Sequence, residues 1–185
     1  MAEKNHAVPA PADVPSAGYT SDPKWKLIGS GTYGKVWRHG DATHVWKSHE
    51  RKNGAASSLA FHQVSLWKNR ISNPPPSLCG IHPFLFEFLD VSELVWLTMP
   101  FVGVALKQDT VRMPDLAPAD EPKLREDLVA AVSYLSSRNL AHCDISLRNV
   151  TRVAPGHPFV LIDFDLLVST DMPQSNYVFR GARHH

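Results

Sequence analysis

A glycine-rich turn near the start of the chain limits what this sequence can fold into. Segment 25–31 (WKLIGSG) predicts a strand that runs into a turn, and 35–38 (KVWR) predicts a second strand. Gly29, Gly31 and Gly34 have the GxGxxG spacing, which dinucleotide-binding folds use at the start of a helix. Here another strand follows, so the glycines are expected at the bend of a β-hairpin. Such a hairpin can lie over phosphates because no side chain obstructs its backbone amides, although an ordinary flexible hairpin explains it equally well.

Sequence periodicity divides the chain into strands, a helix, more strands, a second helix and further strands. Residues 1–23 are rich in proline, alanine and small polar residues and predict a disordered N-terminal arm. The helix predicted at 122–138 repeats apolar residues at helical spacing and is expected to bury one face. This order predicts an α+β fold rather than alternating βαβ units. The other predicted elements are a turn at 39–41, strands at 43–48, 82–90, 93–99 and 159–162, and a helix at 57–71 that prolines 74–76 end. The apolar stripe of the second helix consists of Leu124, Leu128, Ala131, Val132 and Leu135.

The composition indicates a folded chain with little charge bias. Lys and Arg number 19 and Asp and Glu number 18, which gives no electrostatic reason to expect nucleic acid or an anionic membrane as a partner. No apolar run approaches the roughly 18 residues that span a bilayer, and the first residues lack the apolar stretch of a secretory signal. Cys79 and Cys143 are too few for a disulfide framework or a zinc site. We therefore expect an intracellular protein, cytoplasmic or nuclear.

Four polar residues follow the glycine hairpin in an order that suits phosphoryl transfer. Lys47 ends the third predicted strand, where its ammonium group can reach nucleotide phosphates. Asp144 and Asn149 lie in the segment HCDISLRN, and Asp163 comes directly after an apolar strand. Phosphoryl transfer needs magnesium on the phosphates, a carboxylate at the attacking hydroxyl and positive charge on the transferred group. Taken singly, each residue is also explained as a solvated lysine, a polar loop or a turn residue.

The ordered motifs resemble the signature of the eukaryotic protein kinases, which have a glycine loop, a lysine on the third strand, an H-R-D-x-x-x-x-N loop and D-F-G. Here the loop reads H-C-D-I-S-L-R-N (142–149) and the last motif reads D-F-D (163–165). These two variants are similar to the fungal-type protein kinase family. The resemblance covers roughly residues 25–185 and implies a two-lobe kinase-like fold. One lobe would be a small antiparallel β-sheet with one helix, and the other would be mainly helical.

The resemblance also implies domain boundaries, cofactors and site residues. A kinase-like domain would cover 24–185, with an N-terminal lobe at 24–99, a hinge at 100–103 and part of the C-terminal lobe at 104–185, ending in the activation segment. ATP and Mg²⁺ would be the cofactors. Asp144 would orient the substrate hydroxyl, as a catalytic residue together with Lys47 and Arg148. The residues implied to hold ATP are Gly29, Gly31, Gly34, Val36, Lys47 and, through hinge backbone groups, Met99 and Phe101, and those implied to hold magnesium are Asn149 and Asp163.

Three departures from the family pattern affect the expected site. Gln63 stands where the family has the glutamate that pairs with the lysine, and it can hydrogen-bond Lys47 without neutralising it. Cys143 replaces the arginine of H-R-D, and we expect a buried structural cysteine in preference to a reactive thiol. Ser146 replaces the lysine of serine/threonine kinases, whereas Arg148 is placed like the arginine of tyrosine kinases. Arg148 could contact the γ-phosphate or pair with a neighbouring carboxylate, so the type of hydroxyl substrate stays open.

A fourth departure is that the sequence ends at FRGARHH, before the segment and helices that follow in related sequences. We expect the C-terminal lobe to be incomplete and the apolar stripe of the helix at 122–138 to be partly exposed. An exposed stripe of that size would favour either aggregation or a protein partner that covers it.

These observations leave three functions open. The first is an ATP-dependent protein kinase, which the set Lys47, Asp144, Asn149 and Asp163 favours. The second is a non-catalytic kinase-like module that binds nucleotide or a partner. It is favoured by Gln63, Cys143 and the expected lack of the C-terminal helices, and Mg-ATP binding without turnover would distinguish it. The third is a small-molecule phosphotransferase, because aminoglycoside-kinase-like enzymes share the H-x-D-x-x-x-x-N loop. The glycine hairpin and the D-F-D motif argue against the third.

Overall fold

Four strands from the first part of the chain form an antiparallel sheet in the order β1-β2-β3-β4. The structure is a computed structural model that describes residues 23–31, 34–40, 42–50, 63–67, 69–79, 94–106 and 117–171. The strands are β1 (Trp25–Gly31), β2 (Gly34–His39), β3 (His44–Glu50) and β4 (Leu94–Pro100). All four were predicted from the sequence, but β3 extends two residues beyond the predicted 43–48, so Lys47 lies within the strand instead of ending it.

The register of this sheet gives its two faces different side chains. Gly29 pairs with Val36, Val36 with Lys47, and Lys47 with Leu97, so these four residues form one row across the sheet. Side chains alternate along a strand, so the neighbouring residues point to the opposite face. That face carries a cluster of four buried tryptophans, which are Trp25, Trp37, Trp46 and Trp96.

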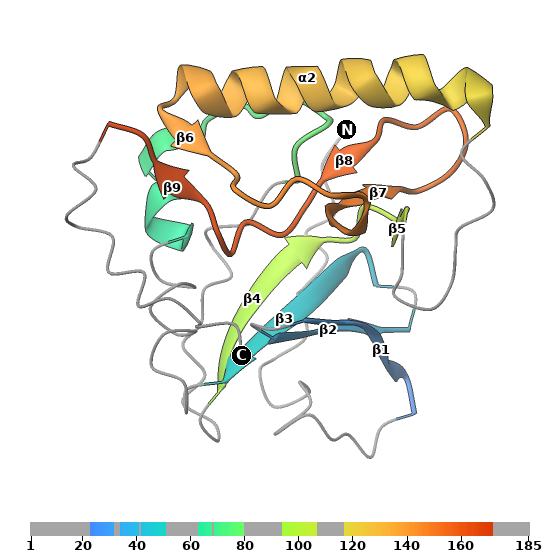
Figure 1. The fold of residues 1–185 in the computed structure, drawn as a ribbon. Coiled ribbons are helices and arrows are strands. Elements are labelled where there is room, and N and C mark those ends of the chain that lie inside the picture. Colours follow the sequence, from blue (N-terminus) through green and yellow to red (C-terminus); the bar gives the residue numbers. More distant parts are fainter. Residues whose placement is uncertain are drawn as a thin grey trace, which may run out of the picture.

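The described residues contain one short helical segment near the sheet and one long helix on the opposite side of the molecule. Residues 63–67 and 69–70 are helical, which agrees with the described part of the helix predicted at 57–71. The predicted strand at 82–90 and residues 1–22 of the predicted arm lie outside the described residues. Helix α2 (Glu121–Ser137) follows the 3-10 turn η3 (Pro118–Asp120) and runs along the side of the molecule opposite the sheet (Figure 1).

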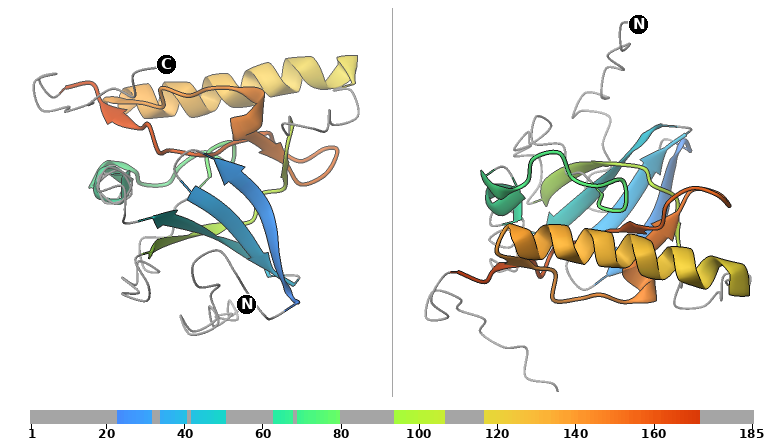
Figure 2. Two further views of the ribbon diagram at one scale, coloured as in Figure 1. Left: turned by 60° about the horizontal axis from the view of Figure 1, so that its bottom comes forward. Right: turned by 90° about the horizontal axis from the view of Figure 1, so that it is seen from above.

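Short strands join α2 to the sheet. Strands β5 (Val104–Ala105), β7 (Val150–Arg152) and β8 (Val160–Leu161) form one small sheet, and β6 (Leu140–Ala141) pairs with β9 (Val168–Ser169). The 3-10 turn η4 (Leu147–Asn149) precedes β7. The left view of Figure 2 shows these segments between α2 and the four-stranded sheet. The strand predicted at 159–162 is therefore present, but only its two central residues pair.

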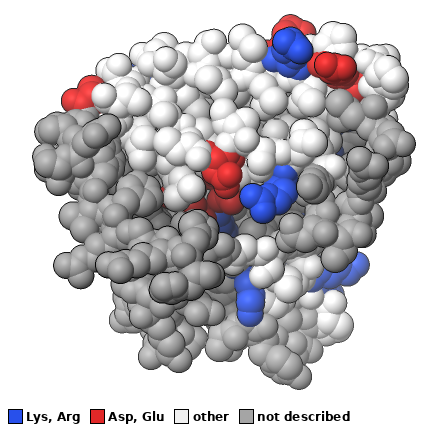
Figure 3. Space-filling view, in the orientation of Figure 1, with Lys and Arg blue, Asp and Glu red and all other residues white. Residues whose placement is uncertain are grey.

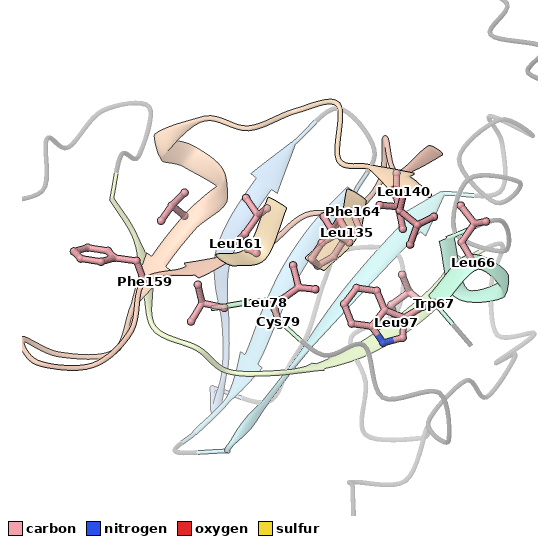
Figure 4. Close-up of a cluster of buried hydrophobic side chains, with 14 of the residues drawn as sticks. Leu66, Trp67, Leu78, Cys79, Leu97, Leu135, Leu140, Phe159, Leu161 and Phe164 are labelled. Carbon is pink, nitrogen blue, oxygen red and sulfur yellow. The ribbon is translucent and has the colours of Figure 1, made fainter. Parts of the chain in front are cut away.

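The apolar core spans this middle layer. Phe159 and Leu161 of the β8 region, Leu135 of α2 and Leu97 of β4 are at most 1% exposed, and Figure 4 shows them in one cluster. A strand-like contact between Leu78 and Leu161 joins the segment after the first helix to the same core. The core therefore fixes the position of the sheet relative to the segments that follow α2.

Helix α2 buries only part of its predicted apolar stripe. Ala131 and Leu135 are buried, and Leu124 and Leu128 pack partly against the core, but Val132 is 39% exposed. This agrees with the expectation that the stripe is partly bare. The α+β class with an antiparallel sheet is confirmed. Among the described residues, no helix combines the length and the apolar character that a membrane crossing requires.

Candidate functional site

The glycine hairpin contains one glycine that the fold requires and two that it does not. A Cβ atom at Gly34 would lie 2.0 Å from the carbonyl oxygen of Ser48, so the close approach of β2 to β3 requires glycine there. A Cβ atom at Gly31 would meet nothing within 4 Å, and one at Gly29 would make only ordinary contact with Val36. Space is therefore left open at Gly31, whereas the Cβ position of Gly29 lies against Val36 in the row that leads to Lys47.

Lys47 is buried and bonded to two carboxylates from the segment after β8. Its Nζ atom donates to Oδ1 of Asp163 at 2.6 Å and to Oδ2 of Asp165 at 2.5 Å. Burial lowers the pKa of Lys47, but the negative charges of Asp163 and Asp165 and their hydrogen bonds outweigh burial and raise the pKa above its ordinary value. Lys47 is therefore a fixed positive charge at the centre of the site.

The two aspartates differ in their access to solvent. The side chain of Asp163 is 34% exposed, whereas that of Asp165 is only 4% exposed. Asp163 has a positive φ of 63°, an uncommon backbone conformation for a residue with a side chain. Phe164 between them is 2% exposed and contacts the rings of Trp67 and His142, at centroid distances of 4.9 and 5.1 Å. The buried Phe164 thus anchors the segment that carries both carboxylates.

His142 connects the segment that precedes Asp163 to the loop of Asp144. Its Nε2 atom lies 2.9 Å from the carbonyl oxygen of Ile162, and its Nδ1 atom lies 3.3 Å from the backbone nitrogen of Asp144. Both contacts are satisfied by the neutral ring with its hydrogen on Nε2. Burial lowers the pKa of His142 despite its bond to Ile162 and the nearby Asp163 and Asp144, so this neutral form is favoured.

Asp144 and Asn149 are joined directly. The Nδ2 group of Asn149 donates to the backbone carbonyl of Asp144 at 2.8 Å and to its Oδ2 atom at 2.9 Å. The backbone carbonyl of Asn149 accepts from the amide of Ile162 at 2.8 Å, which sets this loop beside the strand that leads to Asp163. The structure therefore brings together two pairs of the sequence-predicted site residues, Lys47 with Asp163 and Asp144 with Asn149.

Two residues of the same loop are exposed to solvent. Arg148 is exposed and forms no ion pair with a described residue. Cys143 is also exposed, so the expectation of a buried structural cysteine is wrong. The physical reason is its backbone: Cys143 has a positive φ of 63° between buried His142 and the partly buried Asp144, and this turn directs its side chain outward.

The predicted hinge follows β4, and both its backbone and a side chain contact the sheet. Met99 pairs with Val45 inside the sheet, and the amide of Phe101 donates to the carbonyl of Thr43 at 2.8 Å. The guanidinium group of Arg38 lies 3.8 Å from the centre of the Phe101 ring. The amide of Phe101 is thus already used within the chain, which leaves other hinge backbone groups to bind a ligand.

Sequence reasoning assigned no role to Asp165 and His49, and it expected Gln63 beside Lys47. Gln63 is buried as expected, but its amide group lies 3.3 Å from Oδ1 of Asp165. His49, on the same face of β3 as Lys47, places Nε2 3.3 Å from the same oxygen. The D-F-D motif was the available signal, since its third residue carries a carboxylate where the related pattern has glycine.

The donor set suits magnesium held jointly with phosphates. Within the described residues no group of three or more His, Cys, Asp or Glu side chains could hold a metal ion alone. Mg²⁺ commonly uses one or two carboxylates and completes its shell with water and substrate phosphates. Asp163 offers an accessible carboxylate. Asn149 donates to Asp144 through its Nδ2 group, so its amide oxygen remains as a second ligand. Figure 3 shows acidic and basic side chains next to each other near the middle of one face.

Comparisons with known proteins relate this architecture to kinases. No protein-family model matches the chain. The chain is 26% identical over 168 residues to cyclin-dependent kinase 1 of Encephalitozoon cuniculi (strain GB-M1), covering 83% of this chain and 53% of that protein. The crystal structure of a kinase domain matches with a TM-score of 0.64 and 15% identity, over 80% of this chain and 51% of that chain. The chain thus spans about half the length of these two proteins.

Proposed function

The chain has a protein-kinase-like fold, and we propose from this fold that the protein is an ATP-dependent kinase that transfers the γ-phosphate to a hydroxyl group of a protein. The observation that carries the proposal is the bond between Lys47 of β3 and Asp163 after β8, beside the bonded pair Asp144 and Asn149. A cation, an accessible carboxylate and a second carboxylate with an amide partner are the groups that phosphoryl transfer requires.

Each of these side chains has a proposed role that follows from its surroundings. Magnesium, when bound with ATP, neutralises the charge of the phosphates. Asp163, which is accessible to solvent, and the amide oxygen of Asn149 hold the metal. Lys47 directs its ammonium group to the phosphates, and the open space at Gly31 lets the hairpin backbone approach them. Asp144, oriented by Asn149 and by the contact of its amide with His142, accepts the proton of the substrate hydroxyl.

Nucleotide binding and phosphate transfer test this proposal separately. Titration calorimetry with Mg-ATP is expected to show binding by the unmodified chain, and Asp163→Asn is expected to remove the dependence of that binding on magnesium. Transfer of labelled phosphate to a protein substrate is expected for the unmodified chain and not for Asp144→Asn. Asp171→Asn is a matched control, because Asp171 also pairs with a cation, Arg70, away from this site. Absence of nucleotide binding by the unmodified chain would contradict the proposal.

A second candidate is a kinase-like module that binds nucleotide without transferring phosphate. One observation favours it: Gln63 bonds Asp165 instead of Lys47, and the Lys47 ammonium is shared between two carboxylates. Phosphates would have to compete with Asp163 for this ammonium group. Binding of Mg-ATP with no labelled product, under either magnesium or manganese, would select this candidate.

The proposal also covers the kinase family, the cellular location and a protein partner. The motifs H-C-D-I-S at 142–146 and D-F-D at 163–165 support a place in the fungal-type protein kinase family. We place the kinase in the cytoplasm or nucleus, and a fluorescent fusion would test this location. The exposed Val129 and Val132 of α2 support a protein partner that covers this helix.

A further inference from the structure

The buried carboxylate of Asp165 has a donor for each of its oxygens. Oδ2 accepts from Nζ of Lys47 at 2.5 Å, and Oδ1 lies 3.3 Å from both Gln63 Nε2 and His49 Nε2. Its side chain is 4% exposed, that of Lys47 is 8% exposed and that of His49 is fully buried. A buried charge is stable only when it is paired and hydrogen-bonded, and Asp165 meets both conditions.

The three donors come from two parts of the chain. Lys47 and His49 extend from the same face of β3, and Gln63 extends from the helical segment 63–67. Asp165, which lies in the segment after β8, therefore connects that segment to both the sheet and the helical segment. Through its bond to Nζ, Asp165 controls the position of the Lys47 side chain.

The position of Asp165 also distinguishes it from Asp163. Asp163 is 34% exposed and contacts Lys47 through one oxygen, so it can turn toward a cation without leaving another buried donor unpaired. If Asp165 turned away, the buried side chains of Gln63 and His49 would each lose an acceptor. Asp165 is therefore the fixed partner of Lys47, and Asp163 is the one that is free to exchange.

Gln63 is the side chain that matches this arrangement. It lies at the position where the kinase resemblance leads one to expect a glutamate, yet its amide donates to Asp165. A glutamate there would place a second carboxylate beside Oδ1 of Asp165, and two like charges at that distance repel. A neutral donor at position 63 and a carboxylate at position 165 therefore depend on each other.

We propose that Asp165 is the positioning residue of Lys47, and that it replaces a carboxylate from the helix, with Gln63 as its required neutral partner. This inference rests on the proposed nucleotide site, since the purpose of holding Lys47 is to direct it to phosphates. It predicts that the carboxylate can be moved: Gln63→Glu combined with Asp165→Asn returns the charge to the helix and leaves a neutral amide at position 165.

The test compares the unmodified chain with Asp165→Asn, Gln63→Glu and the double variant. The affinities for ADP and for adenosine are measured by calorimetry or by NMR titration. Each single variant is expected to bind ADP about tenfold more weakly or worse, and the double variant is expected to return to within about threefold of the unmodified chain. Adenosine lacks phosphates, so its affinity is expected to change by less than about twofold, whereas general damage to the fold would weaken both ligands.

A second measurement follows Lys47 without any nucleotide. The rate at which an amine-acylating reagent modifies Lys47 is read by mass spectrometry, with the exposed Lys26 of the same protein as an internal reference. Asp165→Asn is expected to increase the rate at Lys47 and leave Lys26 unchanged. Asp171→Asn, which removes a carboxylate paired with Arg70, is the matched control and is expected to change neither rate.

The outcomes separate this inference from the proposed function. If the unmodified chain binds ADP and Asp165→Asn alters neither ADP affinity nor Lys47 reactivity, the positioning role is wrong and the proposed function stands. If both single variants bind ADP more weakly and the double variant binds it no more tightly than either, the proposed exchange of the carboxylate between positions 63 and 165 is wrong. If Asp165→Asn does not fold, the folded double variant still decides the question. If the unmodified chain binds no ADP, the proposed function is wrong and the phosphate-directing role of Asp165 is wrong with it.

Discussion

Gly31 and Gly34 pair across the hairpin between β1 and β2, and packing treats them differently. A side chain at Gly34 would overlap the Ser48 carbonyl, whereas one at Gly31 would point into open space. We expect Gly34→Ala to lower the free energy of unfolding by about 1–3 kcal/mol, as overpacking does, and Gly31→Ala to change it by less than about 0.5 kcal/mol. Urea denaturation followed by circular dichroism measures both. Equal effects of the two substitutions would contradict the close contact between β2 and β3.

His142 is expected to make the folding stability of the chain depend on pH. Its pKa in the folded state is lowered by burial, while an unfolded histidine titrates near pH 6.5. Below about pH 6.5 the unfolded state binds more protons at this residue, so the free energy of unfolding decreases as the pH falls. The contribution is complete above about pH 6.5 and is lost progressively below it.

Substitution of His142 isolates this contribution. The loss of stability between about pH 8 and about pH 5.5 is expected to be smaller in His142→Gln than in the unmodified chain. The exposed His157 provides the control, since His157→Gln is expected to leave the loss unchanged. Denaturant unfolding at the two pH values gives the comparison, and an identical pH dependence in His142→Gln would refute the expectation.

At the scale of elements, a buried carboxylate joins α2 to the strand region that carries the site. Oδ2 of Asp127 accepts from the amide of Phe159 at 2.9 Å, and its Oδ1 accepts from Lys123 at 2.8 Å. Asp127→Ala leaves the buried amide of Phe159 without a partner, which is expected to cost about 1–3 kcal/mol. Glu126→Ala, on the exposed side of the same helix, is expected to cost less than about 0.5 kcal/mol. The midpoints of chemical denaturation of the two variants measure this difference.

The elements that sequence reasoning found are those whose signals are local. Strands β1 to β4 and helix α2 show alternation or helical periodicity within their own residues. Strands β6 and β9 have two residues each and exist because they pair with each other, so no local pattern marks them. The same holds in the site: Asp165 is separated from Lys47 by 118 positions, and only the folded chain shows that they meet. Lys47 and Asp163 could be related to each other from the sequence alone, because both belong to one ordered family pattern.

At the scale of the whole molecule, Phe164 connects parts that are distant in sequence. Its buried ring packs against Trp67 of the helical segment and against His142 of the loop before η4. We expect Phe164→Ala to cost about 3–5 kcal/mol, as for other large buried aromatic residues, which is a large part of the stability of an ordinary domain. Leu147→Ala, at a position that is 48% exposed, is the matched control and is expected to have little effect. Thermal and urea unfolding would both report the difference.

Strand β3 presents Trp46 to the tryptophan cluster on one face and its neighbours Val45 and Lys47 to the opposite face, where the site lies. A shift of one residue along a strand exchanges its two faces. Deletion of a single codon within β3 would therefore send the ammonium group among the tryptophans and an indole ring toward Asp163 and Asp165. A substitution in this strand can have a small or a large effect, whereas a one-residue change in its length exchanges the two faces. Over evolutionary time, insertions and deletions in this part of the gene are expected to accumulate in the turn before β3 and not within it.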